Sequence, residues 1–382
     1  MIIQKVAKVR TSDPAHYAWT KLRKFQNIEA VTDTIVGVHD VPFEHRDNAR
    51  KQARQLRYCM IQAREYFEAA RAVTIATKPN LLYYGTMSLA LAEILMKQSG
   101  LSSLDKAREE HRHHGLTMSA GAIPNGVNLG VASKEIRALP LEVGGRRRGT
   151  FEMWHRSSRE HPLAGDQTVI YPTGRTTTAF SGLFGALDVP YPPVPKTGLS
   201  LNDCLSGLPL MWDTGSAAYL PSRFIRGRCD SRLVPGAEWS QSIRLMFHPS
   251  SLVQALIERT EIKPDMVDYI DVAEVGGGLQ IDLRSGFVQG HVGFRLPPAA
   301  TIDALEWRMW ANNPPLNEFG YFYVALFLAG NYARYYPDRW LVDVEQSTPL
   351  GLAIEELCNI AEWRVPWLSL CELDFILYVN EA

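Results

Sequence analysis

A long amphipathic stretch near the N-terminus constrains the fold of this chain more than any other part of the sequence. In residues 49–72, small and apolar side chains recur every three or four positions, and arginines and glutamates fill the positions between them. The apolar members are Ala53, Leu56, Cys59, Met60, Ala63, Tyr66, Phe67 and Ala70. This spacing places them on one broad face of an amphipathic helix, which predicts a helical bundle.

Further helices are expected on either side of the middle of the chain. Residues 12–115 predict four or five helices, and one of them, residues 81–98, follows Pro79 and is a natural partner for the helix before it. Near the C-terminus, residues 316–335 predict a strongly apolar helix that Pro337 ends. Residues 348–363 and 366–379 predict two more, separated at Pro366. We expect the C-terminal helices to pack back on the first bundle.

The middle of the chain predicts strands and turns. Short strand-like segments occur at 139–143, 149–154 and 168–171, and alternating residues at 243–247, 266–273, 278–284 and 290–296 predict a small antiparallel sheet. Prolines and glycines cluster between residues 157 and 240, for which no regular fold is predicted. Residues 1–10 predict a short strand or arm. The fold class is therefore mainly α with a mixed α+β middle, divided into residues 1–120, 121–314 and 315–382.

Composition narrows the classes of function. Forty lysines and arginines against 41 aspartates and glutamates give a net charge of -1, so binding to nucleic acid would require a local basic patch. Five dispersed cysteines without C-x-x-C spacing argue against a disulfide framework and favour a cytoplasmic setting. No apolar stretch predicts a membrane span, and no glycine motif predicts a nucleotide cofactor. We therefore expect no membrane partner and no cofactor.

Several sequence motifs together resemble a known family. They are IQAREYFEAA at residues 61–70, KPNLLYYGTMSLALAEIL at 78–95, HRHHGL at 111–116 and FLAGNYARYYPDRW at 327–340, with Trp19 and the turn at Gly149. This combination resembles the YaaC-like family of bacterial cytosolic proteins. The resemblance spans both ends of the chain and leaves residues 157–240 uncovered.

The N-terminal helices also resemble the HEPN superfamily of helical bundles, in which a Tyr-Tyr-containing helix precedes a polar turn with histidine. Many HEPN proteins are metal-independent ribonucleases that use an arginine and a histidine separated by four to six other residues, usually in a dimer. Others are nucleotide-binding or antitoxin-associated modules. Arg108 stands at this spacing from both His113 and His114. The resemblance therefore implies RNA or a nucleotide as partner, and a homo-oligomer.

The chemistry of these side chains also suits a ribonuclease, independently of the resemblance. Cleavage without metal needs a group that takes the 2′-hydroxyl proton, a group that protonates the leaving oxygen, and a cation for the phosphorane. Histidine titrates near neutral pH, so His113 or His114 suits the first two roles, and Arg108 or Arg112 suits the third. Two alternatives stay open. In the first, the positively charged side chains cap a helix end. In the second, His111 and its neighbours bind a divalent ion, although our prediction is that the chain has no metal site.

Two other arginine motifs are candidate binding sites. Arg146, Arg147 and Arg148 follow Gly144-Gly145, which predicts a basic hairpin tip with Trp154 and His155 nearby to stack on bases. Arg334 ends an apolar helix among aromatic residues, so its charge needs a carboxylate, a carbonyl or a ligand.

The sequence supports two hypotheses. The first is an RNA- or nucleotide-directed module of bacterial stress response or antiphage defence, with Arg108, His113 and His114 as the residues of a metal-independent endoribonuclease. The second is a non-catalytic scaffold or binding subunit of a larger complex. Catalysis requires Arg108 and a histidine to face one solvent-open site.

Overall fold

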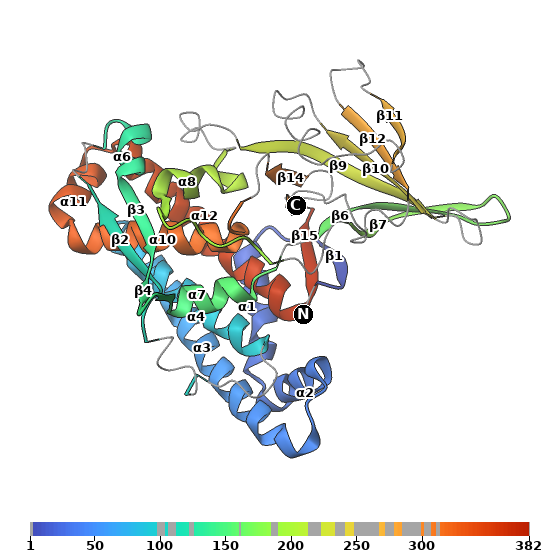
Figure 1. Cartoon of the computed structure of the whole chain (residues 1–382), viewed down its shortest axis with the longest axis horizontal. Coiled ribbons are helices and arrows are strands. Elements are labelled where there is room, and N and C mark those ends of the chain that lie inside the picture. The colour runs from blue at the N-terminus through green and yellow to red at the C-terminus, as the bar shows by residue number, and fades with distance from the viewer. Residues whose placement is uncertain are drawn as a thin grey trace.

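The structure is a computed structural model that describes residues 3–97, 104–105, 112–121, 126–159, 162–184, 190–212, 223–233, 241–247, 267–271, 279–284, 299–301, 307–310 and 314–381. The fold is mainly helical, as predicted, with the helices gathered on one side of the molecule and the largest sheet on the other (Figure 1). Within this part of the chain, no helix has both the length and the hydrophobicity needed to cross a membrane.

The helices occupy the two ends of the chain and part of its middle. The α-helices are α1 (Pro14–Leu22), α2 (Ile28–His39), α3 (Arg46–Ala72), α4 (Lys78–Met96), α6 (Leu129–Glu135), α7 (Thr150–Ser157), α8 (Leu201–Ser206), α10 (Glu318–Tyr335), α11 (Pro337–Glu345) and α12 (Pro349–Asp374). Short 3-10 helices are η1 (Arg23–Gln26), η2 (Phe43–His45) and η3 (Pro209–Trp212). The predicted helices at residues 49–72, 81–98 and 316–335 are thereby confirmed as α3, α4 and α10.

Helix α4 lies at the centre of the helical part. It packs against α3, α7, α10 and α12, and thirteen of its residues are buried, so its apolar surface extends around most of the helix. Gly85 allows the close approach to α3, because a Cβ at this position would lie 2.7 Å from the ring of Phe67. The C-terminal helices thus contact the N-terminal ones directly, as expected.

The end of the chain differs from the prediction of two helices separated at Pro366. Helix α12 continues through Pro366, where one backbone hydrogen bond is lost, and residues after Phe375 form the strand β15 (Ile376–Asn380). Val365, Pro366 and Trp367 are all buried. Burial of these side chains offsets the missing hydrogen bond, so tertiary packing overrides the local helix-breaking tendency of proline.

The two ends of the chain meet in a parallel strand pair. Strand β1 (Lys5–Val9) confirms the short strand predicted at the N-terminus and pairs in parallel with β15, with Lys5 opposite Ile376. Glu381 continues the contact through ion pairs with Lys8 (2.6 Å) and Arg10 (3.3 Å).

Strands also form where no regular structure was predicted. Residues 157–240 contain β6 (Leu163–Ile170), β7 (Thr176–Phe184), β8 (Leu199–Ser200), α8, η3 and β9 (Phe224–Leu233). Strand β6 includes most of the strand-like segment predicted at 168–171, and the other elements correct the expectation of an irregular segment. Strand β9 pairs on both sides, antiparallel to β10 and β14 and parallel to β6. The pairings of β9 with β6 and β14 join segments distant in sequence, so they leave no short-range hairpin pattern.

The largest sheet joins eight described strands in mainly antiparallel order. Its members are β6, β7, β9, β10 (Gln241–Phe247), β11 (Val267–Asp271), β12 (Leu279–Arg284), β13 (Ala299–Thr301) and β14 (Trp307–Trp310). The strands predicted at 243–247, 266–273 and 278–284 are confirmed as β10, β11 and β12, while residues 290–296 lie outside the described residues.

A smaller sheet and a hairpin lie beside the helices. The sheet has three strands in the order β2 (Leu116–Ala120), β3 (Ile136–Pro140) and β8. The hairpin consists of β4 (Glu142–Val143) and β5 (Arg146–Arg147). Residues 149–154, predicted as a strand, instead begin helix α7. Gly149 adopts a φ of 111°, which ends the extended chain, and Phe151, Trp154 and His155 then share the buried face of the helix.

Candidate functional site

Of the predicted catalytic residues, the structure describes His113 and His114, whereas Arg108 lies outside the described residues. The two histidines, with Arg112 before them, lie just before β2 rather than in a helix end. Two glycines hold this segment in place: Gly115 has a φ of 87°, and a Cβ on Gly149 would overlap the backbone of Gly115. Thr150 and Phe151 also donate backbone hydrogen bonds to the carbonyls of His113 (2.9 Å) and His114 (3.0 Å).

His114 contacts both tyrosines of the Tyr-Tyr pair on α4. Its Nδ1 lies 3.0 Å from the hydroxyl oxygen of Tyr83, and its ring centroid lies 6.2 Å from that of Tyr84. His114 nevertheless stays exposed to solvent. The pKa of His114 is lowered, mainly by partial burial and to a smaller extent by the charges of Arg334 and His113. The ring is therefore mostly neutral at neutral pH. An exposed, neutral imidazole is suited to proton transfer or to hydrogen bonding with a ligand.

Arg334 lies in the same place, although it is distant in sequence. It stands at the end of α10, is exposed, and donates a hydrogen bond from Nη1 to the hydroxyl of Tyr84 (3.3 Å). Its guanidinium carbon lies 5.2 Å from the ring centroid of Tyr335. Within the described part of the chain Arg334 forms no ion pair, so its charge is satisfied by a hydroxyl and a ring.

A stacked pair of tyrosine rings completes this arrangement. Tyr66 of α3 and Tyr84 of α4 are both half-buried, and their ring centroids are 5.7 Å apart with an interplanar angle of 27°. We call Tyr66, Tyr83, Tyr84, His114 and Arg334 the His114 cluster. It combines half-buried tyrosine rings, an exposed imidazole and an exposed guanidinium, and single-stranded nucleic acids and nucleotides contact aromatic, imidazole and guanidinium groups.

The basic hairpin is next to the His114 cluster, but its geometry differs from the prediction. The tip consists of Gly144 and Gly145, whose φ values of 60° and 74° are typical of a tight hairpin turn. The arginines follow the tip: Arg146 is exposed on β5, and Arg147 lies 3.8 Å from Glu142 through its Nε. The three guanidinium groups are therefore not gathered at the tip.

Arg148 connects this hairpin to the histidine segment through the backbone. Its amide donates to the carbonyl of Leu141 (3.1 Å), and the amide of Leu141 donates to the carbonyl of Gly115 (3.0 Å).

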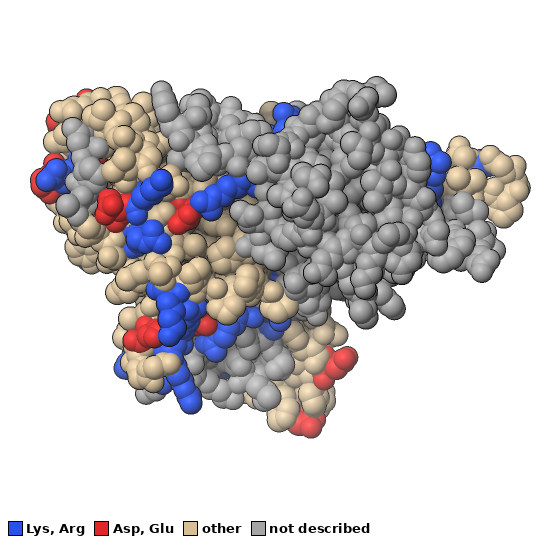
Figure 2. All heavy atoms as spheres, turned by 45° about the horizontal axis from the view of Figure 1, so that its top comes forward, with Lys and Arg blue, Asp and Glu red and all other residues tan. Residues whose placement is uncertain are grey.

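The face drawn in Figure 2 carries Lys and Arg side chains in groups, with Asp and Glu among them. A basic patch without acidic neighbours is thus not present on the described part of that face.

Trp154 and His155 cannot stack on bases, which corrects the prediction for these two residues. Their exposed fractions are 1% and 6%, because both lie on the buried face of α7. His155 Nε2 lies 2.8 Å from the carbonyl oxygen of Pro315, and the indole Nε1 of Trp154 donates to a carboxylate oxygen of Glu93 (2.8 Å).

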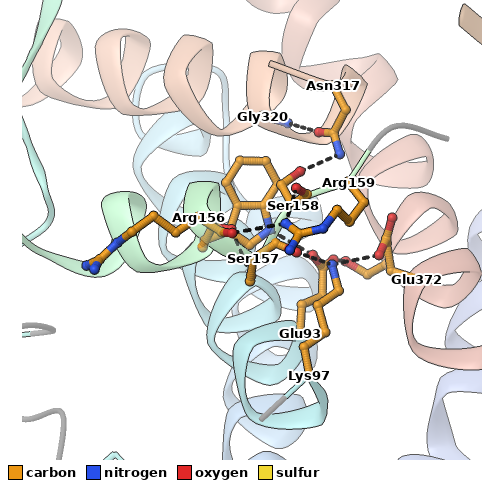
Figure 3. Close-up of polar contacts among 11 residues, drawn as sticks. Glu93, Lys97, Arg156, Ser157, Ser158, Arg159, Asn317, Gly320 and Glu372 are labelled. Atoms are coloured by element: carbon orange, nitrogen blue, oxygen red, sulfur yellow. Dashed lines mark hydrogen bonds and ion pairs between the residues drawn. The ribbon is translucent and has the colours of Figure 1, made fainter. Parts of the chain in front are cut away.

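Glu93 belongs to a second group of ionisable residues, which is buried. Figure 3 shows Glu93 and Lys97 reaching from α4 toward Glu372 of α12, next to the end of α7. Lys97 Nζ lies 2.8 Å from Glu372 Oε2, and Ser369 donates to Glu93 (2.8 Å). We call Glu93, Lys97 and Glu372 the buried carboxylate cluster.

Burial dominates the electrostatics of this cluster. It raises the pKa of Glu93 to about 7, and the negative charge of Glu372 acts in the same direction, while Lys97 and the hydrogen bonds from Trp154 and Ser369 oppose the shift. A pKa near neutrality is typical of functional carboxyl groups. However, Glu93 is 1% exposed, so a ligand does not reach it in this conformation. Of the two groups, only the His114 cluster is open to a ligand.

Among the described residues, no group of three histidine, cysteine or acidic side chains is placed to hold a metal ion. Sequence reasoning noted the Tyr-Tyr pair, Tyr83 and Tyr84, in its helix and placed Tyr66 on the apolar face of residues 49–72, and it named none of the three as a site residue. The available signal was the Tyr-Tyr pair itself, two adjacent residues with polar hydroxyls in an otherwise apolar helix.

Comparison with known proteins supports one assignment. The family model described as YaaC-like Protein matches residues 25–373. No curated protein and no solved structure matches the chain significantly. Because the match covers most of the sequence, the chain belongs to the YaaC-like protein family.

Proposed function

We propose that this YaaC-like chain is an RNA- or nucleotide-directed module and that the His114 cluster is its binding site. The observation that carries the proposal is the position of Arg334. It is an exposed guanidinium with no ion pair among the described residues, beside two stacked tyrosine rings and an exposed histidine. Guanidinium groups bind phosphate oxygens with paired hydrogen bonds, and aromatic rings stack on bases.

The proposal includes a metal-independent ribonuclease activity of the HEPN type. A neutral histidine can take the 2′-hydroxyl proton, a second histidine can protonate the leaving 5′-oxygen, and an arginine can stabilise the phosphorane. His113 and His114 supply the two imidazoles, and Arg334 adds a cation to those predicted at Arg108 and Arg112. A role in stress response or antiphage defence, which the HEPN resemblance implies, belongs to the same proposal.

The test measures cleavage and binding separately. The purified full-length protein is incubated with labelled single-stranded RNA in the presence of EDTA, beside the double variant His113→Ala, His114→Ala. Affinity for the same RNA is measured by fluorescence anisotropy for the wild type and for Arg334→Ala. The matched control is Arg10→Ala, which removes one exposed positive charge from the β1 end of the chain.

The expected result is cleavage that the double variant loses, and binding that Arg334→Ala weakens about tenfold while Arg10→Ala retains it. Binding without cleavage would support the module and remove the ribonuclease. Absence of both in a folded wild type would overturn the proposal.

A non-catalytic binding subunit is the second candidate, and one observation favours it. Val131 of α6, Leu341 and Val342 of α11 and Leu352 of α12 are large apolar residues that are each more than two-fifths exposed. These helices are neighbours, since α12 contacts both α6 and α11. Apolar side chains concentrated on neighbouring elements are typical of a protein contact. A Leu352→Glu variant that lowers the mass of a purified complex in light scattering would support this candidate.

A further inference from the structure

The hydrogen bond between Tyr83 and His114 determines what His114 can offer to a ligand. We propose that Tyr83 is a positioning residue that holds the neutral ring of His114 with its hydrogen on Nε2, so that His114 meets a phosphate as a hydrogen-bond donor. The part of this proposal that concerns a phosphate ligand rests on the proposed function. The position of the hydrogen is a property of the free protein and is tested without RNA.

The first step is that Tyr83 keeps its proton. The side chain is 3% exposed, and burial raises its pKa well above the ordinary range, with the hydroxyls of Tyr323 and Tyr84 acting in the same direction. At neutral pH Tyr83 is therefore a phenol with one hydrogen to donate. Its oxygen lies 3.0 Å from Nδ1 of His114, which is a normal hydrogen-bond distance.

The second step concerns the direction of that hydrogen bond. Tyr323 is completely buried, and its hydroxyl and that of Tyr83 lie close enough to shift each other's pKa. The Tyr323 hydroxyl has no hydrogen-bond partner of good geometry among the described residues. Because a buried hydroxyl needs an acceptor, the oxygen of Tyr83 is where the Tyr323 hydrogen is best placed.

With its oxygen facing the Tyr323 hydrogen, Tyr83 has its own hydrogen to place elsewhere. The other neighbour within reach is the sulfur of Met87 at 3.9 Å, which is a weak acceptor. Nδ1 of His114 is the stronger acceptor and is closer. Tyr83 therefore donates its hydrogen to Nδ1 of His114.

The third step is that His114 is neutral and has a free outer nitrogen. Its charged and titratable neighbours are Arg334 from α10, Tyr83 and Tyr84 from α4, and His113 from its own segment. Since Arg334 and His113 disfavour a second positive charge and Nδ1 accepts from Tyr83, the single hydrogen of the neutral ring belongs on Nε2. Nε2 is then a hydrogen-bond donor on a ring whose pKa the nearby charge of Arg334 lowers.

This arrangement divides the roles of the two histidines. An Nε2 that carries a hydrogen cannot take a proton from a 2′-hydroxyl, but it can donate a hydrogen bond to a phosphate oxygen beside the guanidinium of Arg334. In cleavage, His113 is then the residue left to act as the base. His114→Gln, whose amide can still donate, should retain RNA binding better than His114→Ala does.

The experiment determines the tautomer by nuclear magnetic resonance on the full chain labelled with ¹⁵N-histidine. Long-range proton–nitrogen correlation spectra distinguish an unprotonated imine-type nitrogen from a protonated pyrrole-type nitrogen. The spectra are recorded at a pH above the pKa of His114, and the His114 signals are assigned by their loss in His114→Gln. The variants are Tyr83→Phe and Tyr323→Phe. The matched control is Tyr84→Phe, which removes a hydroxyl that bonds to Arg334 rather than to His114.

The expected spectrum shows an imine-type Nδ1 and a pyrrole-type Nε2 in the wild type and in Tyr84→Phe. Tyr83→Phe should raise the Nδ1-protonated fraction roughly fivefold, the factor that one net hydrogen bond contributes, and Tyr323→Phe should raise it less. A wild type with the hydrogen on Nδ1, or a Tyr83→Phe spectrum equal to the wild type, would overturn the inference.

If Tyr83→Phe does not fold, the wild-type and Tyr323→Phe spectra decide the question on the same criteria. Failure of the two proposals can also be distinguished. A protein with the expected tautomer that binds no RNA loses the proposed function alone, while one that binds RNA with the other tautomer loses only the role of Tyr83.

Discussion

Helix α4 carries two groups of ionisable residues that differ in almost every physical respect. At Tyr83 and Tyr84 it contributes to the His114 cluster, which faces solvent and has a guanidinium without an ion pair among the described residues. Nearly three turns later, at Glu93 and Lys97, it contributes to the buried carboxylate cluster, which is enclosed by α7 and α12. The comparison shows that one helix can serve a site open to ligands and a polar centre of the core.

The difference predicts opposite responses to substitution. Groups in the core have their partners in place, so altering them exposes an unpaired charge to a low dielectric and destabilises the fold. The exposed members of the His114 cluster, His114 and Arg334, lie in water, so altering them changes ligand binding and leaves the free energy of unfolding nearly the same.

The largest effect is expected from Lys97→Met. This change leaves Glu93 and Glu372 without their shared cation in the core, and breaking a buried ion pair in this way costs about 3–5 kcal/mol of unfolding free energy. The matched control is Arg64→Met, which breaks an exposed ion pair within α3 (Arg64 to Glu68, 2.7 Å) and should cost about 0.5 kcal/mol at most. Urea unfolding measures both, and equal losses would show that the buried cluster contributes no more than a surface pair.

The second prediction concerns pH. Glu93 has a pKa of about 7 in the folded protein, above the value of about 4.3 expected for an unfolded chain. The folded state therefore binds the proton more tightly. The stability from this group is complete below about pH 4.3 and is lost as the pH rises through about 7.

Glu93→Gln should remove this pH dependence. Each unit of pKa shift corresponds to about 1.4 kcal/mol, so the difference in unfolding free energy between wild type and variant should change by a few kcal/mol across that pH window. Thermal unfolding at several pH values measures it. A difference that is independent of pH would mean that Glu93 titrates normally in the fold.

The third prediction concerns the glycine pair that holds the histidine segment. Gly149→Ala forces a side chain into a φ of 111° and against Gly115, so the expected loss is about 1–3 kcal/mol of unfolding free energy. Gly37→Ala is the control, because it lies within α2 with nothing inside 4 Å of the added Cβ and should stabilise the helix by up to about 1 kcal/mol. If both variants unfold at the same denaturant concentration, the close approach of the two glycines is not needed.

The fourth prediction tests the open side of the comparison. Tyr84→Leu removes the stacking face and the hydroxyl that holds Arg334, and loss of one base–aromatic contact weakens RNA binding by about 1–3 kcal/mol. Tyr58→Leu is the control, since Tyr58 is 56% exposed elsewhere on α3. Anisotropy titrations with single-stranded RNA compare the two, and an equal loss in both would place RNA away from the His114 cluster.

The smallest effect is expected in the salt dependence of binding. If Arg334 contacts one phosphate, Arg334→Ala should reduce the slope of log affinity against log salt by about 0.7 for single-stranded RNA. An unchanged slope, measured over a series of salt concentrations, would show that Arg334 touches no phosphate.

Local sequence patterns predicted the long helices well, because the spacing of apolar residues in a helix depends only on residues that are close in sequence. The apolar stripe of residues 49–72 appears as α3, and the apolar run after Pro79 appears as α4. The same reasoning failed at residues 149–154, where the left-handed conformation of Gly149 ends the extended chain. It also failed at Pro366, where burial of the neighbouring side chains keeps α12 continuous.

The candidate site was predictable only in part, because long-range packing assembles it. His113, His114 and Arg334 were identified as chemically suitable residues, and Tyr83 and Tyr84 were noted in their helix. Nothing local indicates that Arg334 lies beside Tyr84, since this contact depends on the packing of α10 against α4. Trp154 and His155 illustrate the converse, because only the packing of α7 shows that they are buried.

The parallel pairing of β1 with β15 has a consequence for how the protein forms on the ribosome. Lys5 cannot find Ile376 until nearly the whole chain has been synthesised, and domains otherwise fold in order from the N-terminus. Strand β1 therefore cannot pair with β15 before the helices α10 and α12, which pack against α4, have been synthesised. The closing of this pair is then a late event, and the nascent chain depends on its solubility during that interval.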